Sequence, residues 1–246
     1  MRLQVKYFLL IAALLASLLL LGYITKRPRR VWLPVYGGMT SELKDSEFYE
    51  DMSSGKTFCF LGDSITCGTE TGGITWFDPL VPYIKGDVIN YSYGGWTSKD
   101  LAGNLEPIPA ADIYVVAVGI NDVLRAEELP DEFTTEKYIA NLEVLTDRLR
   151  ESSPDSKIYF ITPWIFFDRS DECNRLREEF SEALMNWCNG EDRICIDPYP
   201  FTLAVTEADG REPYMYNYFH PNAERGVGLF SYSVLAADHQ RRLNLE

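Results

Sequence analysis

Short apolar runs alternate with longer segments of helical periodicity from residue 57 onward, and this alternation restricts the fold more than any other feature of the chain. Five runs rich in β-branched and aromatic residues read as continuously apolar, as strands covered on both faces do: residues 57–61, 88–91, 113–118, 157–161 and 193–196. Residues 134–150 and 171–188 place leucine and aromatic side chains along one helical face. We therefore predict an α/β fold with a doubly wound, five-stranded parallel sheet, in which ligands bind at the carboxyl ends of the strands.

The chain has 246 residues, of which 46% are hydrophobic. This is enough for one core of roughly 200 residues and an appendage, but not for two full domains. We predict a membrane anchor with basic flanks at residues 1–30, a stalk or linker at residues 31–55, and one folded domain at residues 56–246. The stalk prediction rests on early prolines and glycines and on a polar run at residues 46–54.

The anchor prediction comes from the uncharged stretch YFLLIAALLASLLLLGYIT between Lys6 and Lys26. Its length is close to the ~20 residues that a membrane-spanning helix needs, and it has no polar face, unlike a soluble core helix. A cleaved signal peptide is the main alternative. However, Ala12, Ala13 and Ala16 fall inside the apolar run, and no clear A-x-A site follows it. We predict a single-pass N-terminal transmembrane helix that is not cleaved from the protein.

Basic residues on both sides of this stretch bear on its orientation. They are more numerous on its C-terminal side, which by the positive-inside rule would place the domain in the cytosol. The N-terminal tail is very short and carries an α-amino charge of its own, which is the arrangement of an ordinary export signal. We favour an extracytoplasmic domain.

The net charge of −14 is unevenly distributed along the chain. Residues 1–30 contain six basic residues and no acid, so residues 31–246 carry −20. A body this acidic repels phosphate backbones, and we predict no nucleic-acid partner. The simplest interpretation of the acidity itself is a well-solvated surface. The five cysteines are odd in number and form no C-x-x-C pair, so neither a complete disulfide framework nor a zinc site is expected.

Two glycine-containing segments follow the first two predicted strands. In FLGDSIT, Ser64 lies at a strand-to-helix turn, where its Oγ can be presented at the carboxyl edge of the sheet beside a backbone N–H that receives an oxyanion. In NYSYGGWTS, Gly94 and Gly95 let the backbone approach a ligand and donate a second N–H. Each segment alone is equally consistent with a turn or a helix cap.

Two further segments carry polar side chains suited to the same chemistry. In VGINDV, after the third predicted strand, Asn121 can supply a side-chain N–H to the oxyanion, although an Asx turn or a helix cap would also use it. In YNYFHPN, His220 is one of only two histidines. The other, His239, lies in a polar helical tail, so His220 is the plausible general base, although a lone histidine is often structural.

These four segments, in this order and each after a predicted strand, resemble the SGNH, or GDSL, hydrolase family over roughly residues 57–240. The resemblance implies that Ser64 is the nucleophile and His220 its base. It implies an oxyanion hole made of the backbone N–H groups of Ser64 and Gly95 together with the side chain of Asn121. It also implies a flavodoxin-like three-layer sandwich, no metal and no organic cofactor.

One position departs from the family pattern. Family members usually carry an aspartate three residues before the histidine, where this chain has Asn217. In serine proteases the same change lowers kcat about 10⁴-fold because the histidine tautomer is no longer held correctly. Three outcomes are open: a Ser-His dyad with a backbone carbonyl orienting His220, replacement by a nearby acid such as Asp209 or Glu212, or an inactive site.

Tryptophans near the predicted strand ends are candidates for substrate contacts. Trp96 follows the proposed oxyanion glycine and Trp164 follows the fourth strand, and either ring could stack on a sugar face or simply pack in the core. We expect a serine-dependent ester hydrolase that acts through an acyl-enzyme on an acylated cell-envelope glycan or a similar small ester. An O-acyltransferase using the same site and a catalytically impaired glycan-binding module are the alternatives.

Overall fold

The computed structural model describes residue 33, residues 38–189 and residues 193–245. Within these ranges, five parallel strands form one sheet in the order β2-β1-β3-β4-β5, which is the flavodoxin-like order. The strands are β1 Phe58–Gly62, β2 Val88–Ser92, β3 Ile113–Ala117, β4 Lys157–Ile161 and β5 Ile194–Ile196. All five predicted strands are confirmed, and their ends agree with the predicted ends to within one residue.

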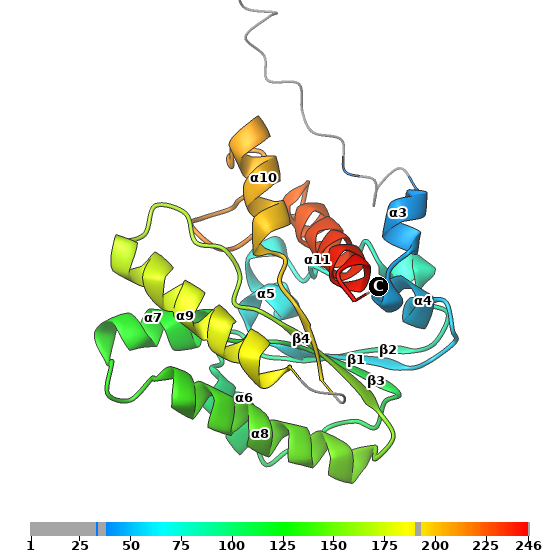
Figure 1. The fold of residues 1–246 in the computed structure, drawn as a ribbon, viewed down its shortest axis with the longest axis horizontal. Helices are drawn as coiled ribbons and strands as arrows, with labels where there is room; N and C mark the ends of the chain where they lie inside the picture. Colours follow the sequence, from blue (N-terminus) through cyan, green and yellow to red (C-terminus); the bar gives the residue numbers. More distant parts are fainter. Residues whose placement is uncertain (1–32, 34–37, 190–192, 246) are drawn as a thin grey trace, which may run out of the picture. The chain divides into compact units, whose positions relative to one another are not determined.

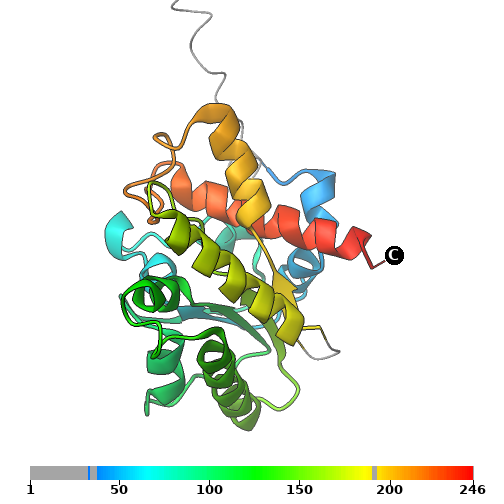
Figure 2. The ribbon, with the colours of Figure 1, turned by 60° about the vertical axis from the view of Figure 1, so that its left-hand side comes forward.

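Helices cover both faces of the sheet (Figures 1 and 2). One layer contains α6 Ser98–Gly103, α7 Ile120–Glu128, α8 Thr135–Ser152 and α9 Asp171–Trp187, which contact one another in pairs. On the other side, α11 Gly226–Leu243 contacts α3 Ser41–Lys44, α4 Glu47–Met52 and α10 Tyr199–Asp209. The short helix α5 Ser64–Cys67 follows β1, and two 3₁₀ turns, η1 Thr69–Thr71 and η2 Val81–Tyr83, precede β2.

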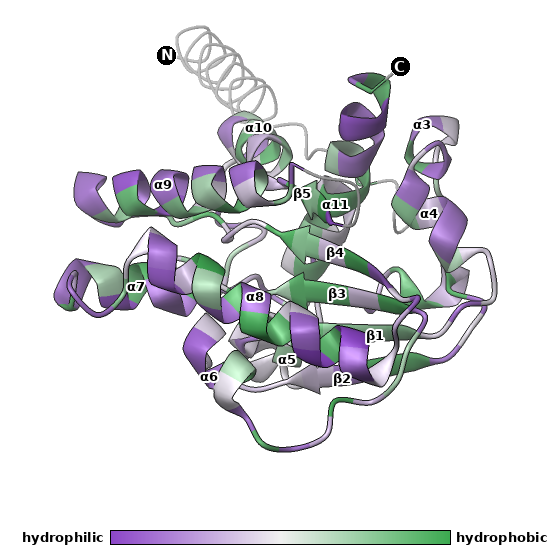
Figure 3. Cartoon of the chain, turned by 60° about the horizontal axis from the view of Figure 1, so that its bottom comes forward, coloured by the Kyte–Doolittle hydropathy of each residue, from purple (hydrophilic) through white to green (hydrophobic). Residues whose placement is uncertain are grey.

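The core lies on both faces of the central strands. Every residue of β1 and β3 is buried, and the strands stand out as hydrophobic in Figure 3. On the α11 side, Phe60 of β1 stacks on Phe77 with ring centroids 3.8 Å apart and meets the edge of Trp76 at 5.6 Å. Burial on both faces explains why these strands read as continuously apolar in the sequence.

The predicted boundary between stalk and domain differs from the structure. Residues 41–52 fall in the predicted stalk, yet they form α3 and α4, and Phe48 and Met52 of α4 are fully buried. The ring of Phe48 packs edge-on against Phe58 and Tyr159. The polar residues around Phe48 and Met52 led to the prediction of a stalk. The two apolar residues are four positions apart, so they share one face of a single helical turn. The folded part of the chain therefore begins well before residue 56.

The predicted membrane anchor at residues 1–30 lies outside the described residues. Among the helices that the structure does describe, none combines the length and the apolar character that crossing a bilayer requires.

Candidate active site

Ser64 is placed by a sharp turn between β1 and α5. It is the first residue of α5, and the side chain of Asp63 caps this helix, with Oδ1 accepting a hydrogen bond from the Ile65 N–H at 3.0 Å. Gly62 ends β1 against β3, where a Cβ would collide with the carbonyl oxygen of Ala117. Gly62 thus allows the close approach of β1 and β3, Asp63 caps α5, and Ser64 begins this helix. Together they hold Ser64 at the carboxyl edge of the sheet.

His220 lies between α10 and α11 and reaches the same point. Its Nε2 is 2.8 Å from the Oγ of Ser64, although 156 positions separate the two residues. The surrounding segment folds back on itself, with the Tyr216 N–H donating to the His220 carbonyl at 2.9 Å and the Phe219 ring against the imidazole. Burial lowers the pKa of His220 below its usual 6.5, while the charge of Glu70 opposes this shift, so the imidazole is mainly neutral at pH 7.

Asn217 contacts the other ring nitrogen of His220. Its Oδ1 accepts hydrogen bonds from the backbone N–H groups of Phe219 at 3.0 Å and His220 at 2.8 Å, and its Nδ2 lies 2.9 Å from the His220 Nδ1. Two backbone donors require the amide oxygen on their side, which turns the NH₂ group toward the ring. Nδ1 must then accept, and the neutral imidazole carries its hydrogen on Nε2.

This tautomer has a direct consequence for Ser64. With its hydrogen on Nε2, His220 donates to the Ser64 Oγ instead of accepting the hydroxyl proton. A general base needs the opposite arrangement, with hydrogen on Nδ1 and a free lone pair on Nε2. The arrangement therefore resembles that of a triad whose aspartate has been replaced by asparagine.

Neither acid considered as a substitute orients the ring. Asp209 accepts a hydrogen bond from the Tyr214 hydroxyl at 2.7 Å. Glu212 is exposed and lies 3.9 Å from Arg211. Both ring nitrogens of His220 are already in contact with the serine and asparagine side chains described above, so the position proposed for a backbone carbonyl or another acid is taken by the amide.

The two further residues predicted to donate to an oxyanion lie at the ends of the strands on either side of β1. Asn121 is in the first turn of α7, after β3, and its Nδ2 donates to the Trp96 carbonyl at 2.9 Å. An amide NH₂ has two hydrogens, so one remains for an oxyanion. Gly95, after β2, is exposed and adopts a φ of 79°, which favours glycine. The contact of Asn121 with Trp96 brings the second and third motifs together.

A small pocket lies at Ser64 and His220. Its lining includes Glu70 and Thr71 of η1, which were not among the predicted site residues. Gly95 and Asn121 are not part of this lining. The lining residues are Ser64, Ile65, Gly68, Glu70, Thr71, His220 and Pro221. Only the closeness of η1 to Ser64 in the sequence could have pointed to Glu70 and Thr71.

The two predicted substrate-binding tryptophans differ in their surroundings. Trp164 is only 2% exposed, stacks on Phe230 at 4.4 Å and meets Trp76 edge-on, so it packs in the core, and the substrate-contact prediction for it is not supported. Trp96 is half-buried and stacks on the exposed ring of Tyr93 with centroids 4.0 Å apart. Tyr93 was missed in the sequence, although it lies only three residues before Trp96.

Two buried aspartates are the sequence neighbours of candidate site residues: Asp63 precedes Ser64, and Asp122 follows Asn121. Burial raises the pKa of Asp63 to about 7 and that of Asp122 to about 6, and the charge of Asp122 adds to the shift of Asp63. The raised pKa reduces the negative charge that Asp63 carries beside Ser64 near neutral pH.

Comparison with known sequences agrees with these motifs. A model of the GDSL-like lipase/acylhydrolase family matches residues 60–224, which is more than half of the chain. No curated protein sequence matches.

Solved structures share the fold. A GDSL-like lipase from Parabacteroides merdae is 18% identical and has a TM-score of 0.64, with 76% of this chain and 97% of that chain covered. The acetylxylan esterase Axe2 from Geobacillus stearothermophilus is 22% identical with a TM-score of 0.61, covering 75% and 94%. LAE5, an α/β hydrolase from the metagenome of Lake Arreo in Spain, is 20% identical with a TM-score of 0.60, covering 76% and 96%.

Proposed function

Because the chain belongs to the GDSL-like lipase/acylhydrolase family and is a carboxylic ester hydrolase, we propose that Ser64 is its nucleophile and His220 its general base. The observation that carries this proposal is the 2.8 Å contact between the Ser64 Oγ and the His220 Nε2, made by residues from opposite ends of the domain. This distance is within hydrogen-bond reach, as proton transfer requires.

The reaction proceeds through an acyl-enzyme. The Ser64 Oγ attacks the ester carbonyl as its proton passes to the His220 Nε2, and His220 then gives this proton to the departing alcohol. The backbone N–H groups of Ser64 and Gly95 and the side chain of Asn121 stabilise the tetrahedral oxyanion. Water, activated by the same histidine, attacks the acyl-enzyme and releases the acid.

Asn217 limits the rate of this reaction. For His220 to accept a proton, its hydrogen must move to Nδ1, where it faces the NH₂ group of Asn217. Otherwise the amide must turn over and lose both of its backbone hydrogen bonds. The variants of Axe2 called catalytic mutants replace a serine, a histidine and an aspartate three residues before that histidine. That spacing equals the spacing of Asn217 and His220 and supports their assignment as the corresponding pair.

The substrate in this proposal is an O-acylated glycan of the cell envelope or a similar small ester. Axe2 is described as an acetylxylan and acetyl-xylooligosaccharide esterase, which supports an acetylated sugar. The stacked rings of exposed Tyr93 and half-buried Trp96 lie beside the proposed oxyanion glycine and offer a surface on which a sugar face can stack. A single-pass anchor with the domain outside the cytoplasm would place the enzyme at such a substrate.

One other function is favoured by a specific observation. The orientation of the Asn217 amide also fits a glycan-binding module that keeps the pocket but has lost turnover. The transferase alternative has no such observation in its favour.

Fluorophosphonate labelling combined with p-nitrophenyl acetate hydrolysis separates the hydrolase from the binding module. We expect wild-type protein to be labelled at Ser64 and to turn over the ester slowly, and Ser64→Ala to do neither. A folded wild-type protein that is not labelled and hydrolyses no faster than Ser64→Ala would favour the binding module. Turnover that survives in Ser64→Ala would refute the assignment of the nucleophile.

A further inference from the structure

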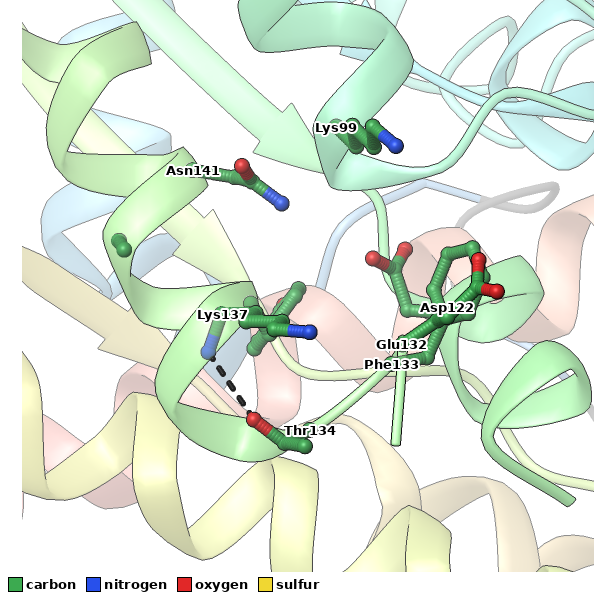
Figure 4. Close-up of a pocket in the computed structure, with 9 residues that line it drawn as sticks. Lys99, Asp122, Glu132, Phe133, Thr134, Lys137 and Asn141 are labelled. Carbon is green, nitrogen blue, oxygen red and sulfur yellow. Dashed lines mark hydrogen bonds between the residues drawn. The ribbon is translucent and has the colours of Figure 1, made fainter. Parts of the chain in front are cut away.

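A pocket of about 330 Å³ lies between α6, α7 and α8, outside the lining of the proposed catalytic pocket. Figure 4 shows Asp122 reaching into it from α7, Asn141 from α8 and Lys99 from α6. Asp122 is 2% exposed, so its carboxylate is almost entirely removed from bulk water. A buried carboxylate is tolerated only where hydrogen bonds replace its hydration.

Those hydrogen bonds come from one residue of α6. The backbone N–H of Ser98 donates to the Asp122 Oδ2 at 2.9 Å, and the Ser98 hydroxyl donates to Oδ1 at 2.5 Å. The Asn141 Nδ2 in turn donates to the Ser98 Oγ at 3.0 Å. Ser98 is fully buried. Its hydrogen bonds join the starts of α6 and α7 to the first half of α8.

The two helix starts joined in this way carry the proposed oxyanion donors. Gly95 precedes Ser98 by three residues, and Asn121 is the residue before Asp122. The two segments are also joined directly by the Asn121 Nδ2, which donates to the Trp96 carbonyl at 2.9 Å. The network through Asp122 therefore fixes, from inside the fold, the separation of two donors that belong to different elements.

We propose that Asp122, acting through Ser98 and supported by Asn141, is a positioning residue that holds the Gly95 and Asn121 oxyanion donors at their working separation. The proposal rests on the function proposed above and adds to it a second set of residues that never touch the substrate. Donors of an oxyanion hole act only when they are preorganised around the developing charge. A displacement of about 1 Å is enough to cost roughly 100-fold in rate.

The start of α6 provides a matched control for this idea. Asp100 also hydrogen-bonds at this helix start, accepting from the Thr97 N–H at 2.9 Å and the Thr97 hydroxyl at 2.7 Å in a capping box. These contacts stay within α6 and do not reach α7. A substitution at Asp100 thus weakens the same helix without releasing the link between the two donor segments.

The test compares Ser98→Ala and Asp122→Asn with Asp100→Asn, each in the wild-type and in an Asn217→Asp background. The ester is p-nitrophenyl acetate, kcat and KM are determined separately, and the rate of fluorophosphonate labelling at Ser64 is a second readout. Asn141→Ala removes only the hydrogen bond from Asn141 to the Ser98 Oγ and serves as a milder variant. Thermal denaturation verifies that each protein is folded.

We expect Ser98→Ala and Asp122→Asn to lower kcat roughly 10- to 100-fold with KM nearly unchanged, because donors are displaced while ground-state binding is kept. Asp100→Asn should lower the melting temperature but keep kcat, and Asn141→Ala should give a smaller loss of kcat. Folded Ser98→Ala and Asp122→Asn proteins that keep parental kcat, or that change only KM, would overturn the positioning role. Failure of the proposed function is separate, because it would show as turnover retained in Ser64→Ala.

Discussion

The chemistry of the site depends on a single atom at position 217. An aspartate there would accept the backbone N–H groups of Phe219 and His220 with one oxygen and the Nδ1–H of His220 with the other, whereas Asn217 presents an NH₂ group to the ring. We predict that Asn217→Asp raises kcat for p-nitrophenyl acetate by about 10²- to 10⁴-fold, because the carboxylate favours the tautomer that frees Nε2. Steady-state kinetics at pH 7 to 8 would measure this.

Stability serves as the control for this substitution. Since a carboxylate can keep both backbone hydrogen bonds, the melting temperature of Asn217→Asp should stay close to that of the wild type, while Asn217→Ala leaves two N–H groups without their acceptor and should melt lower. If Asn217→Asp is folded yet no faster than the wild type, the tautomer of His220 does not limit turnover.

At the residue scale the sequence predicted which side chains meet, but not how they are protonated. The meeting of Ser64 and His220 followed from motifs placed after parallel strands, because all carboxyl ends lie at one edge of a sheet. The orientation of the Asn217 amide depends on where two backbone N–H groups point, which no pattern of side chains encodes. The burial of Trp164 against Phe230 is likewise a tertiary contact with a distant helix.

At the element scale, α4 is attached to β4 through a buried carboxylate. Asp51 accepts from the Lys157 ammonium at 2.5 Å and from the Tyr159 hydroxyl at 2.7 Å, and it pairs with Lys56 at 2.9 Å. Burial alone would raise the pKa of Asp51, but the hydrogen bonds from Lys157, Tyr159 and Lys56 outweigh it and hold the pKa below 3.8. When folding lowers the pKa of a carboxyl group, the group stabilises the fold at any pH above its pKa in the unfolded chain. This stabilisation is lost as the pH falls through the lower pKa of the folded protein.

We therefore predict that Asp51→Asn lowers the free energy of unfolding by about 1 to 3 kcal/mol at pH 7. The difference from the wild type should shrink as the pH falls below 3.8 and through the lower pKa of folded Asp51, because the carboxylate is then protonated. Urea denaturation at pH 7 and near pH 3 would measure both values. Glu172→Gln, which removes an exposed ion pair with Arg175, should leave the free energy of unfolding unchanged at both pH values. A difference between Asp51→Asn and the wild type that does not depend on pH would contradict the pKa argument.

Elements with a strong pattern were predictable, and elements without one were not. The five strands are short, continuously apolar runs, and α8 and α9 carry long helical periodicities, so the ends of these elements were predicted to within a few residues. By contrast, α3 and α4 have only 4 and 6 residues, and their few apolar side chains are surrounded by polar ones. Such short helices depend on their packing against β1, β4 and α11 for stability.

At the scale of the whole molecule, α4 near the start of the described chain and α11 near its end are joined by hydrogen bonds and ion pairs. The Phe48 N–H at the start of α4 donates to the fully buried Asp238 of α11 at 2.7 Å. Arg241 binds the other oxygen of Asp238 and also pairs with Glu47, while Arg242 pairs with Glu50 at 2.6 Å. Segments some 190 positions apart thus share one set of hydrogen bonds and ion pairs, so α3 and α4 should unfold together with the sheet and not before it.

Deletion of residues 38–55 tests this cooperative unit against the stalk predicted from the sequence. Loss of the Phe48 side chain alone should cost about 3 to 5 kcal/mol, which for a domain of this size corresponds to roughly 10 °C in Tm. We expect the deletion to lower Tm by at least that amount or to abolish the single transition, and Phe48→Ala to show the same trend without shortening the chain. Deletion of residues 1–32 is the matched control and should leave the transition of the domain in place. A segment that contributes to the core cannot be removed without exposing the apolar surface that it covers. An unchanged Tm after removal of residues 38–55 would therefore mean that α3 and α4 are a dispensable stalk.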